Sequence, residues 1–243
     1  MKWPFRKLTP LDRQLEKMRA DWDLRARENA RHFIVTGKDQ WSDEEFFASG
    51  VQSVEEEILT DMTNICHGRA PQDMRVLEIG CGAGRVTRAL AEVFGEVHAV
   101  DVSGEMIEQA SRALAAFPHA HVYRNNGMDL SVVPNLPFDF AFSFIVFQHI
   151  PSQLIVENYV REVYRLLRPG GLFKFQVNGI TNHGRLAKVL PPEMRRSAPV
   201  DTWLGAPMSE EEAVRMAERT GFDCRYRLGA ETQYFWLWYF KHA

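Results

Sequence analysis

The chain has 243 residues, of which 45% are hydrophobic and 25% are charged, a balance typical of a folded globular protein rather than a disordered one. This length accommodates one α/β core with an accessory segment, and not two independent domains. The net charge of −3 provides no strong field that would draw the whole molecule to nucleic acid or to an anionic membrane.

The cysteine content bears on the redox compartment. Cys66, Cys81 and Cys224 are widely spaced and form neither a C-x-x-C pair nor a metal-ligand pattern. An odd and sparse set of this kind favours a reducing cytosol, so we expect a cytoplasmic protein. The first residues contain no apolar signal segment, and the longest apolar stretch, around residues 141–147, is too short to span a bilayer. We therefore expect no membrane partner.

Residues 1–70 are expected to form a helical segment that acts as a lid. Residues 10–35 place apolar side chains, including Met18 and Trp22, at helical spacing. Ser42 and Glu45 match a capping box that opens a second helix. Residues 1–38 carry ten Lys and Arg against five Asp and Glu. This excess indicates either a solvated helix face or a basic arm that recruits an acidic partner.

From residue 71 onward, strands and helices alternate. Strands are predicted at residues 76–79, 97–100, 121–124, 138–146 and 172–177, with helices at 86–94, 106–116 and 153–167. Alternation of this kind predicts a parallel sheet with helices on both faces. We therefore expect residues 71–243 to form one α/β domain with a Rossmann-like, doubly wound sheet.

The C-terminal part of the chain follows a different pattern. Ser209 and Glu212 match another capping box, for a helix that ends at Gly221. The strands predicted at 222–228 and 233–240 would form an antiparallel hairpin that closes the mostly parallel sheet. The second of these strands is almost continuously aromatic. That composition favours a central strand buried on both faces, although a substrate wall or a subunit contact would also use it.

The chemistry-bearing motif lies where the first predicted strand meets the first helix of the domain, and residues 78–84 there read Glu-Ile-Gly-Cys-Gly-Ala-Gly. Glycines allow the chain to turn sharply and to approach a ligand closely, and the helix N-terminus offers free N–H groups to an anionic group. Asp101, at the end of the second predicted strand, is placed to accept hydrogen bonds from both hydroxyls of a ribose. The alternative is that Asp101 only caps the helix that follows.

The glycine turn distinguishes between classes of ribose-bearing ligand. In the dinucleotide-binding fingerprint G-x-G-x-x-G, the third glycine would fall at position 85, which is Arg85 here. The chain instead reads E-x-G-x-G-x-G, and it resembles the class I S-adenosylmethionine (SAM)-dependent methyltransferases, specifically their type 11-like small-molecule subgroup. The resemblance covers residues 74–175. Its further parts are Asp101, residues 125–127, the strand 138–145 with residues 147–150, and the turn 167–171.

The resemblance implies a SAM-binding site, with Glu78 in the strand that precedes the turn. It places Gly80, Cys81 and Gly82 along the methionine part of the cofactor, Asp101 on the ribose, and Val102 and Met106 beside the adenine. Asn126 stands where the family usually has Asp, and its carbonyl oxygen can still accept a hydrogen bond from the adenine amino group. The other implied contacts are Gly127 and Met128 beside Asn126, Ser143, Phe144 and Ile145 from the fourth strand, and Phe47 and Gly50 from the lid.

The resemblance also implies transfer of the methyl group to a small-molecule acceptor by in-line displacement at an oxygen or nitrogen nucleophile. No motif identifies the acceptor, and no nucleic-acid-binding module is present in the sequence. Residues 179–207 are an insertion at the place where the family builds its acceptor pocket. Its basic residues either attract an acidic acceptor or belong to a solvated lid: Arg185, Lys188, Arg195 and Arg196.

His149 is the candidate catalytic residue, as a base or as an orienting group. It follows the fourth predicted strand, at the sheet edge where ligands bind in doubly wound folds, and histidine titrates near neutral pH. The opposing interpretation is that His149 packs under the next helix and hydrogen-bonds the backbone. His183 competes for the same role. Two other functions stay open, an NAD(P)-dependent oxidoreductase, which Arg85 disfavours, and a non-catalytic SAM-binding module, which the intact glycine turn disfavours.

Overall fold

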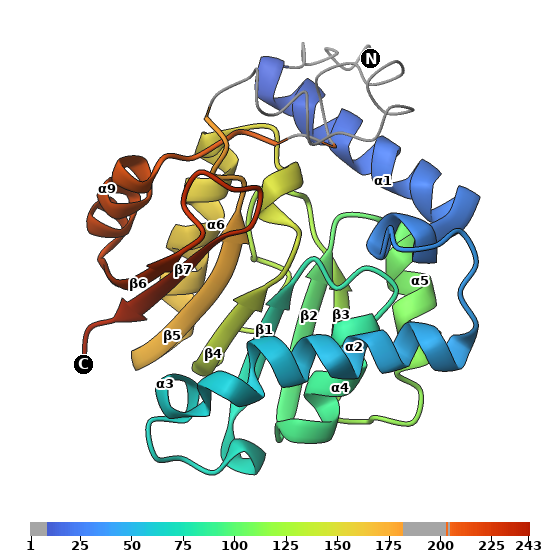
Figure 1. Cartoon of the computed structure of the whole chain (residues 1–243), viewed down its shortest axis with the longest axis horizontal. Coiled ribbons are helices and arrows are strands. Elements are labelled where there is room, and N and C mark those ends of the chain that lie inside the picture. The colour runs from blue at the N-terminus through green and yellow to red at the C-terminus, as the bar shows by residue number, and fades with distance from the viewer. Residues whose placement is uncertain (1–8, 182–202, 204) are drawn as a thin grey trace, which may run out of the picture.

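The structure is a computed structural model that describes residues 9–181, 203 and 205–243. Its centre is a seven-stranded sheet with the strand order β3-β2-β1-β4-β5-β7-β6 (Figure 1). The strands are β1 (Arg75–Ile79), β2 (Glu96–Asp101), β3 (Ala120–Arg124), β4 (Phe138–Ser143), β5 (Leu167–Val177), β6 (Phe222–Leu228) and β7 (Phe235–Lys241).

The sheet is mostly parallel, as the alternating sequence pattern predicts. The five strands from β3 to β5 run parallel to one another, whereas β7 is antiparallel to both of its neighbours, β5 and β6. The Rossmann-like α/β fold and its antiparallel C-terminal hairpin are therefore confirmed.

The described helices are α1 (Pro10–Ile34), α2 (Asp43–Glu57), α3 (Met62–Cys66), α4 (Arg85–Val93), α5 (Gly104–Ala113), α6 (Gln153–Leu166) and α9 (Glu210–Thr220). Side-chain caps open the helices α1, α2, α5, α6 and α9, whereas α3 and α4 begin without one. The predicted capping boxes of α2 and α9 are confirmed, because Ser42 and Ser209 each accept a hydrogen bond from the backbone N–H three residues later, at 3.2 Å.

Helices cover both faces of the sheet and bury two separate apolar cores. On one face, α6 and α9 pack against side chains such as Leu77, Phe173 and Leu237. On the other face, α2, α3 and α4 pack against Val76 and Phe142, and α5 covers the same face of β2. The middle strands β1, β4 and β7 are thus mostly apolar on both sides, whereas the neighbouring strand β5 carries the buried polar side chains Lys174 and Gln176 on one face.

The structure corrects two predicted boundaries. The apolar run from Phe138 predicts a strand that reaches residue 146, but β4 ends at Ser143, because Ile145 takes a left-handed conformation with φ 57°. Strand β5 begins earlier than predicted, at Leu167. The pairing between β4 and β5 moves from Phe138–Leu167 to Phe140–Leu172, so residues 168–171 form a bulge at the start of β5 and not a separate turn.

The aromatic strand β7 lies inside the sheet, between β5 and β6. Its side chains from Phe235 to Phe240 are buried, except that Trp238 is half-buried, which confirms the predicted central strand. Trp238 donates a hydrogen bond from Nε1 to Asp61 at 2.6 Å. The C-terminal hairpin is thereby tied to the N-terminal helical segment.

Helix α1 crosses the top of the molecule in Figure 1, over the end of the sheet at which the parallel strands terminate. Leu15 and Met18 on its inner face join the apolar core that contains Leu77 and Val100. A search of the described helices finds none that is long and apolar enough to cross a membrane.

Candidate active site

A cavity lies at the carboxyl ends of β1, β2 and β4 under α1, with roughly 930 Å³ of empty volume that includes space open to solvent. This is the sheet edge at which ligands bind in doubly wound folds. The predicted site residues that line it are Glu78, Gly80, Cys81, Gly82, Asp101, Val102, Met106, Phe144 and His149, together with Ile145.

The glycine turn after β1 forms the floor of this cavity. Gly80 and Gly82 have φ values of 81° and 52°, in the left-handed region that glycine adopts without strain. A Cβ atom on Gly80 would lie 2.2 Å from a methyl group of Val146. The backbone N–H groups of Gly80 and Cys81 both donate to the carbonyl of Val100, at 2.7 and 3.0 Å. The turn is therefore fixed against β2 before any ligand binds.

Asp101 is held by backbone donors on both sides of its carboxylate. Oδ1 accepts a hydrogen bond from the N–H of Ser103 at 2.9 Å, and Oδ2 accepts one from the N–H of Gly82 at 2.9 Å. Burial raises the pKa of Asp101 to about 6, and these hydrogen bonds oppose the rise. The side-chain cap of α5 is Ser103, whose Oγ accepts from Met106 N. Asp101 thus contributes to the cap only by orienting Ser103. A carboxylate has about four acceptor sites, and the backbone N–H groups of Ser103, Gly82 and Val102 interact with it, so acceptor capacity remains for a ligand.

Glu78 is a second buried carboxyl group at the floor of the cavity, only 4% exposed. It accepts a hydrogen bond from the Thr87 hydroxyl at 2.6 Å. Burial raises its pKa to about 7, against the hydrogen bond from Thr87 and the positive charge of Arg85. Glu78 therefore binds protons near neutrality and is able to serve as donor or acceptor to a ligand.

The sequence predicts a lid over residues 1–70 but does not say which of its side chains face the cavity. Met18, Trp22, Phe33 and Ile34 of α1 line it from above. The helical spacing of Met18 and Trp22 identifies a buried helix face but does not say which surface covers it. The one sequence signal that this helix could cover a binding site is its position in the chain, directly before the α/β domain.

Two further lining residues carry polar atoms that are buried and lack a hydrogen-bond partner within the described part of the chain, namely Nε of Arg85 and Oδ1 of Asn125. Nη1 of Arg85 donates a hydrogen bond to the Ser49 carbonyl oxygen at 2.7 Å. Burial lowers the pKa of Arg85 to about 10, so it stays a cation at neutral pH. Nδ2 of Asn125 donates to the Tyr159 hydroxyl at 2.7 Å. The wall of the cavity thus contains one unpaired donor and one unpaired acceptor, both covered in this structure.

Three residues implied to lie beside the adenine do not line the cavity, namely Asn126, Gly127 and Met128. Asn126 is exposed, and its Oδ1 accepts from the N–H groups of Met128 and Asp129 within a turn. Asn125, one residue earlier, lines the cavity instead. Gly127 and Met128 lie behind the lining residues, since a Cβ on Gly127 would meet Met18 at 2.9 Å.

The remaining implied contacts also lie away from the cavity. The Ser143 hydroxyl donates to the Ile79 carbonyl at 2.9 Å and joins β4 to β1. Phe47 lies beside Arg88, whose guanidinium carbon is 4.7 Å from the ring centre, at a separate surface depression. A Cβ on Gly50 would lie 2.1 Å from the Arg85 carbonyl oxygen, so this glycine allows α2 to approach α4 closely.

His149 is 6% exposed and forms part of the cavity wall. Its Nδ1 lies 2.7 Å from the Trp203 carbonyl oxygen, so Nδ1 carries the proton and Nε2 carries the lone pair. Gln148 Nε2 is 3.2 Å from that Nε2. Burial lowers the pKa of His149 to about 4, and the ring is therefore neutral at physiological pH. Two interpretations of His149 were open, a packed residue that hydrogen-bonds the backbone and a residue that acts on the acceptor. The structure shows both the backbone hydrogen bond and a position in the cavity wall.

A second chamber adjoins the first. It has about 1480 Å³ of empty volume, including space open to solvent, and shares Arg85, Phe144 and His149 with the first chamber. Among the described residues, its other lining side chains are mostly aromatic, amide and hydroxyl groups, with Glu56 as the carboxylate: Phe33, Trp41, Trp203, Tyr234, Gln52, Gln148, Asn178, Gln233, Thr36, Ser49 and Ser53. Ile34, Val35, Gly37 and Ile145 complete the lining. Two chambers with a common wall are suited to a reaction between two bound ligands. His183 and the four basic residues of the insertion lie outside the described residues.

Comparisons with known proteins agree with this geometry. Residues 76–171 match a family described as a methyltransferase domain. Over 103 residues the chain is 34% identical to the malonyl-[acyl-carrier protein] O-methyltransferase of Enterobacter lignolyticus, an alignment that covers 42% of this chain and 38% of that protein. The chain thus spans about two fifths of the length of this curated relative.

Solved structures share the fold over almost the whole chain. Magnesium protoporphyrin IX methyltransferase from Synechocystis PCC 6803, solved with bound SAH, is 16% identical with a TM-score of 0.64, covering 93% of this chain and 99% of that one. Phosphoethanolamine N-methyltransferase 1 from Haemonchus contortus, in complex with phosphoethanolamine and S-adenosylhomocysteine, is 16% identical with a TM-score of 0.71, covering 97% of this chain and 50% of that one.

Proposed function

The chain belongs to the class I SAM-dependent methyltransferases, and from this premise we propose that it transfers the methyl group of SAM to a small-molecule acceptor with an oxygen or nitrogen nucleophile. The observation that carries the proposal is the pair of adjoining chambers. One contains the glycine turn and Asp101, and the other opens on the far side of the shared residues Phe144 and His149.

The polar groups of the first chamber fit SAM. The Asp101 carboxylate suits the two ribose hydroxyls, the unpaired Nε–H of Arg85 suits the carboxylate of the methionine part, and the unpaired Oδ1 of Asn125 suits an amino group. Apolar surface for the adenine is supplied by Val102 and Met106. Among the implied residues that lie off the cavity, we assign Phe47, Gly50, Asn126, Gly127, Met128 and Ser143 to its support rather than to contact.

SAM supplies a methyl carbon that is already electrophilic, because it is bonded to a sulfonium. The protein therefore has to orient the acceptor and exclude water, and orientation can supply most of the acceleration. The roof formed by Met18, Trp22, Phe33 and Ile34 covers the first chamber. We accordingly propose that residues 1–70 serve as the lid of the domain formed by residues 71–243.

His149 acts on the acceptor rather than on the cofactor. With a pKa of about 4, the imidazole is neutral at physiological pH. It would also be a weak base toward a proton taken from the acceptor. General-base catalysis is most efficient when the pKa lies near the working pH. We therefore assign His149 an orienting role, in which the nucleophile of the acceptor takes the place of Gln148 Nε2 as the hydrogen-bond donor to Nε2.

The acceptor class follows from what the second chamber displays. Its amides and aromatic rings, with Glu56 and Arg85 as the charged side chains among the described lining residues, suit a neutral or weakly charged molecule with a planar part. Because the relative cited above is named an O-methyltransferase, carboxylic acids and phenols are the first acceptors to test. We place the protein in the cytoplasm, without a nucleic-acid or membrane partner, in agreement with its three free cysteines.

The test combines binding and turnover. Calorimetry should show one site for SAM and for S-adenosylhomocysteine, and a panel of carboxylic acids, phenols and amines should identify an acceptor that generates S-adenosylhomocysteine. A folded protein that binds neither compound, or that is stabilised against heat by NADH and not by SAM, would contradict the proposal. Binding without turnover on any acceptor would favour the non-catalytic module.

A further inference from the structure

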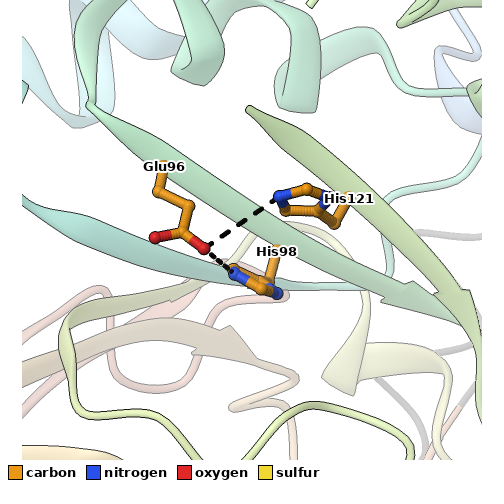
Figure 2. A group of neighbouring side chains, drawn as sticks. All are labelled: Glu96, His98 and His121. Carbon is orange, nitrogen blue, oxygen red and sulfur yellow. Dashed lines mark hydrogen bonds and ion pairs between the residues drawn. The ribbon is translucent and has the colours of Figure 1, made fainter. Parts of the chain in front are cut away.

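Three potential metal ligands converge at the sheet edge opposite the cavity. Glu96 and His98 are two residues apart at the beginning of β2, so they project from the same face, and His121 on β3 is in register with His98. In Figure 2 the Glu96 carboxylate points toward both imidazoles. Its Oε1 lies 2.7 Å from Nε2 of His98 and 4.0 Å from Nε2 of His121, and the ligand atoms of all three residues lie within 4.8 Å of one another.

We propose that Glu96, His98 and His121 bind one zinc ion. Zinc forms bonds of about 2.0–2.2 Å to histidine and carboxylate ligands in a tetrahedral arrangement, which separates two ligand atoms by about 3.3–3.5 Å. The separations of 2.7 and 4.0 Å lie on either side of this value, so small side-chain rotations suffice. Two imidazoles with one carboxylate suit zinc and not the oxygen-binding ions magnesium and calcium.

Neighbouring groups already orient two of the three ligands. Nδ1 of His98 lies 3.0 Å from the Tyr123 hydroxyl, and a zinc-bound histidine commonly has its other ring nitrogen hydrogen-bonded in this way. Arg75 donates from Nε to Oε2 of Glu96 at 2.8 Å, which leaves Oε1 directed at the imidazoles. Because Arg75 shares the carboxylate with the ion, the zinc affinity is lower than that of a site with more anionic ligands.

Burial differs across the cluster in a way that permits entry of an ion. His98 is 2% exposed and its ring meets Phe138 edge-on, with ring centres 5.2 Å apart, so this ligand is fixed. The side chains of His121 and Glu96 are 42% and 30% exposed. A solvated ion reaches them directly and keeps water in its fourth position. Since β3 is the edge strand of the sheet, the bound ion joins that edge to its neighbour.

The experiment is a calorimetric titration of the chelator-treated full chain with zinc chloride, and with magnesium chloride as the comparison ion. We expect one zinc per chain, a rise in the unfolding temperature with zinc, and no response to magnesium. Loss of an outer-shell partner of a metal ligand typically costs about 10- to 100-fold in affinity, so loss of a ligand in His121→Ala should cost at least about 100-fold.

His119→Ala is the matched control, because this neighbouring imidazole instead bonds the Ala91 carbonyl, at 2.8 Å. Its zinc affinity should equal that of the unaltered protein. Glu96→Gln keeps an acceptor for Arg75 and provides a second variant if His121→Ala fails to fold. The proposal would be overturned if the unaltered protein bound no zinc, or if His121→Ala and Glu96→Gln both bound zinc as tightly as the unaltered protein. The cluster would then be only a hydrogen-bonded link between β2 and β3.

Discussion

Replacement of Asp101 by Asn tests the assignment of the first chamber most directly. The exchange removes the negative charge and keeps one acceptor oxygen, so only one of the two backbone donors, Ser103 N–H or Gly82 N–H, retains its partner. Asp101→Ala would leave both donors without an acceptor. The structure therefore predicts that part of any effect of Asp101→Ala comes from folding, and that Asp101→Asn separates binding from stability better.

The size of the effect follows from the hydrogen bonds involved. A buried donor left without a partner costs about 1–3 kcal/mol, which is the expected loss in the free energy of unfolding for Asp101→Asn. A hydrogen bond to a charged group contributes about 1.5–3 kcal/mol. Loss of one such bond to a ribose hydroxyl should therefore raise the Kd for S-adenosylhomocysteine by about 10- to 150-fold.

The assay is calorimetry at 25 °C with S-adenosylhomocysteine, with urea denaturation of the same samples. Asp139→Asn is the matched control. Asp139 is also a buried aspartate that accepts a backbone N–H, from Arg75 at 2.7 Å, but it does not line the cavity. This control should lose stability and keep its affinity. Equal Kd values for the unaltered protein and a folded Asp101→Asn variant would refute the reasoning and make Asp101 a purely structural residue.

Three further predictions follow from the same site. Because burial raises the pKa of Asp101 to about 6 and ribose hydroxyls require its ionised form, affinity for S-adenosylhomocysteine should be constant above that pH and fall as the pH is lowered through it; calorimetry between pH 5 and pH 8 should show a smaller change in Asp101→Asn. His149→Ala should lower turnover by about 100-fold, because a misplacement of the acceptor by about 1 Å costs that much, and the affinity for S-adenosylhomocysteine should be nearly unchanged. Because burial lowers the pKa of His149 to about 4, the rate of the unaltered enzyme should show no titration of this ring near pH 7. Trp22→Ala should speed dissociation of S-adenosylhomocysteine, measured by stopped flow, because Trp22 lines the cavity from α1. Leu24→Ala, on the same helix but 51% exposed, should leave the dissociation rate unchanged. Equal dissociation rates for Trp22→Ala and the unaltered protein would show that α1 is not part of the lid.

The sheet and the cofactor-facing turn were accessible to sequence reasoning because their signals are local. The glycines at 80 and 82 need left-handed backbone, and the carboxylate of Asp101 stands at a strand end, so residue type and position together specify the role. The aromatic strand β7 was likewise predictable, since burial on both faces requires apolar residues at every position.

The parts that escaped prediction depend on tertiary contacts. Whether Asn125 or Asn126 enters the cavity is decided by a turn in which Asn126 accepts two backbone hydrogen bonds, and the sequence of two adjacent asparagines does not distinguish them. The end of β4 was misplaced because the apolar run continues through Ile145, whose positive φ has no signature in an isoleucine. A lid was predicted for residues 1–70, but not which side chains of α1 line the cavity, because periodicity identifies a buried helix face without its partner.

The location of β7 inside the sheet also constrains the order in which the protein assembles. Strand β6 precedes β7 in the chain, yet it stands at the edge of the sheet and forms its ladder with β7. Until residues 235–241 have been synthesised, β6 has no strand to join and the long, apolar β5 presents an unpaired edge. Such edges are templates for association with other chains. A nascent chain interrupted before Phe235 would thus retain the entire glycine turn and still be prone to aggregate, and loss of residues 235–241 should damage the protein more than their distance from the cavity suggests.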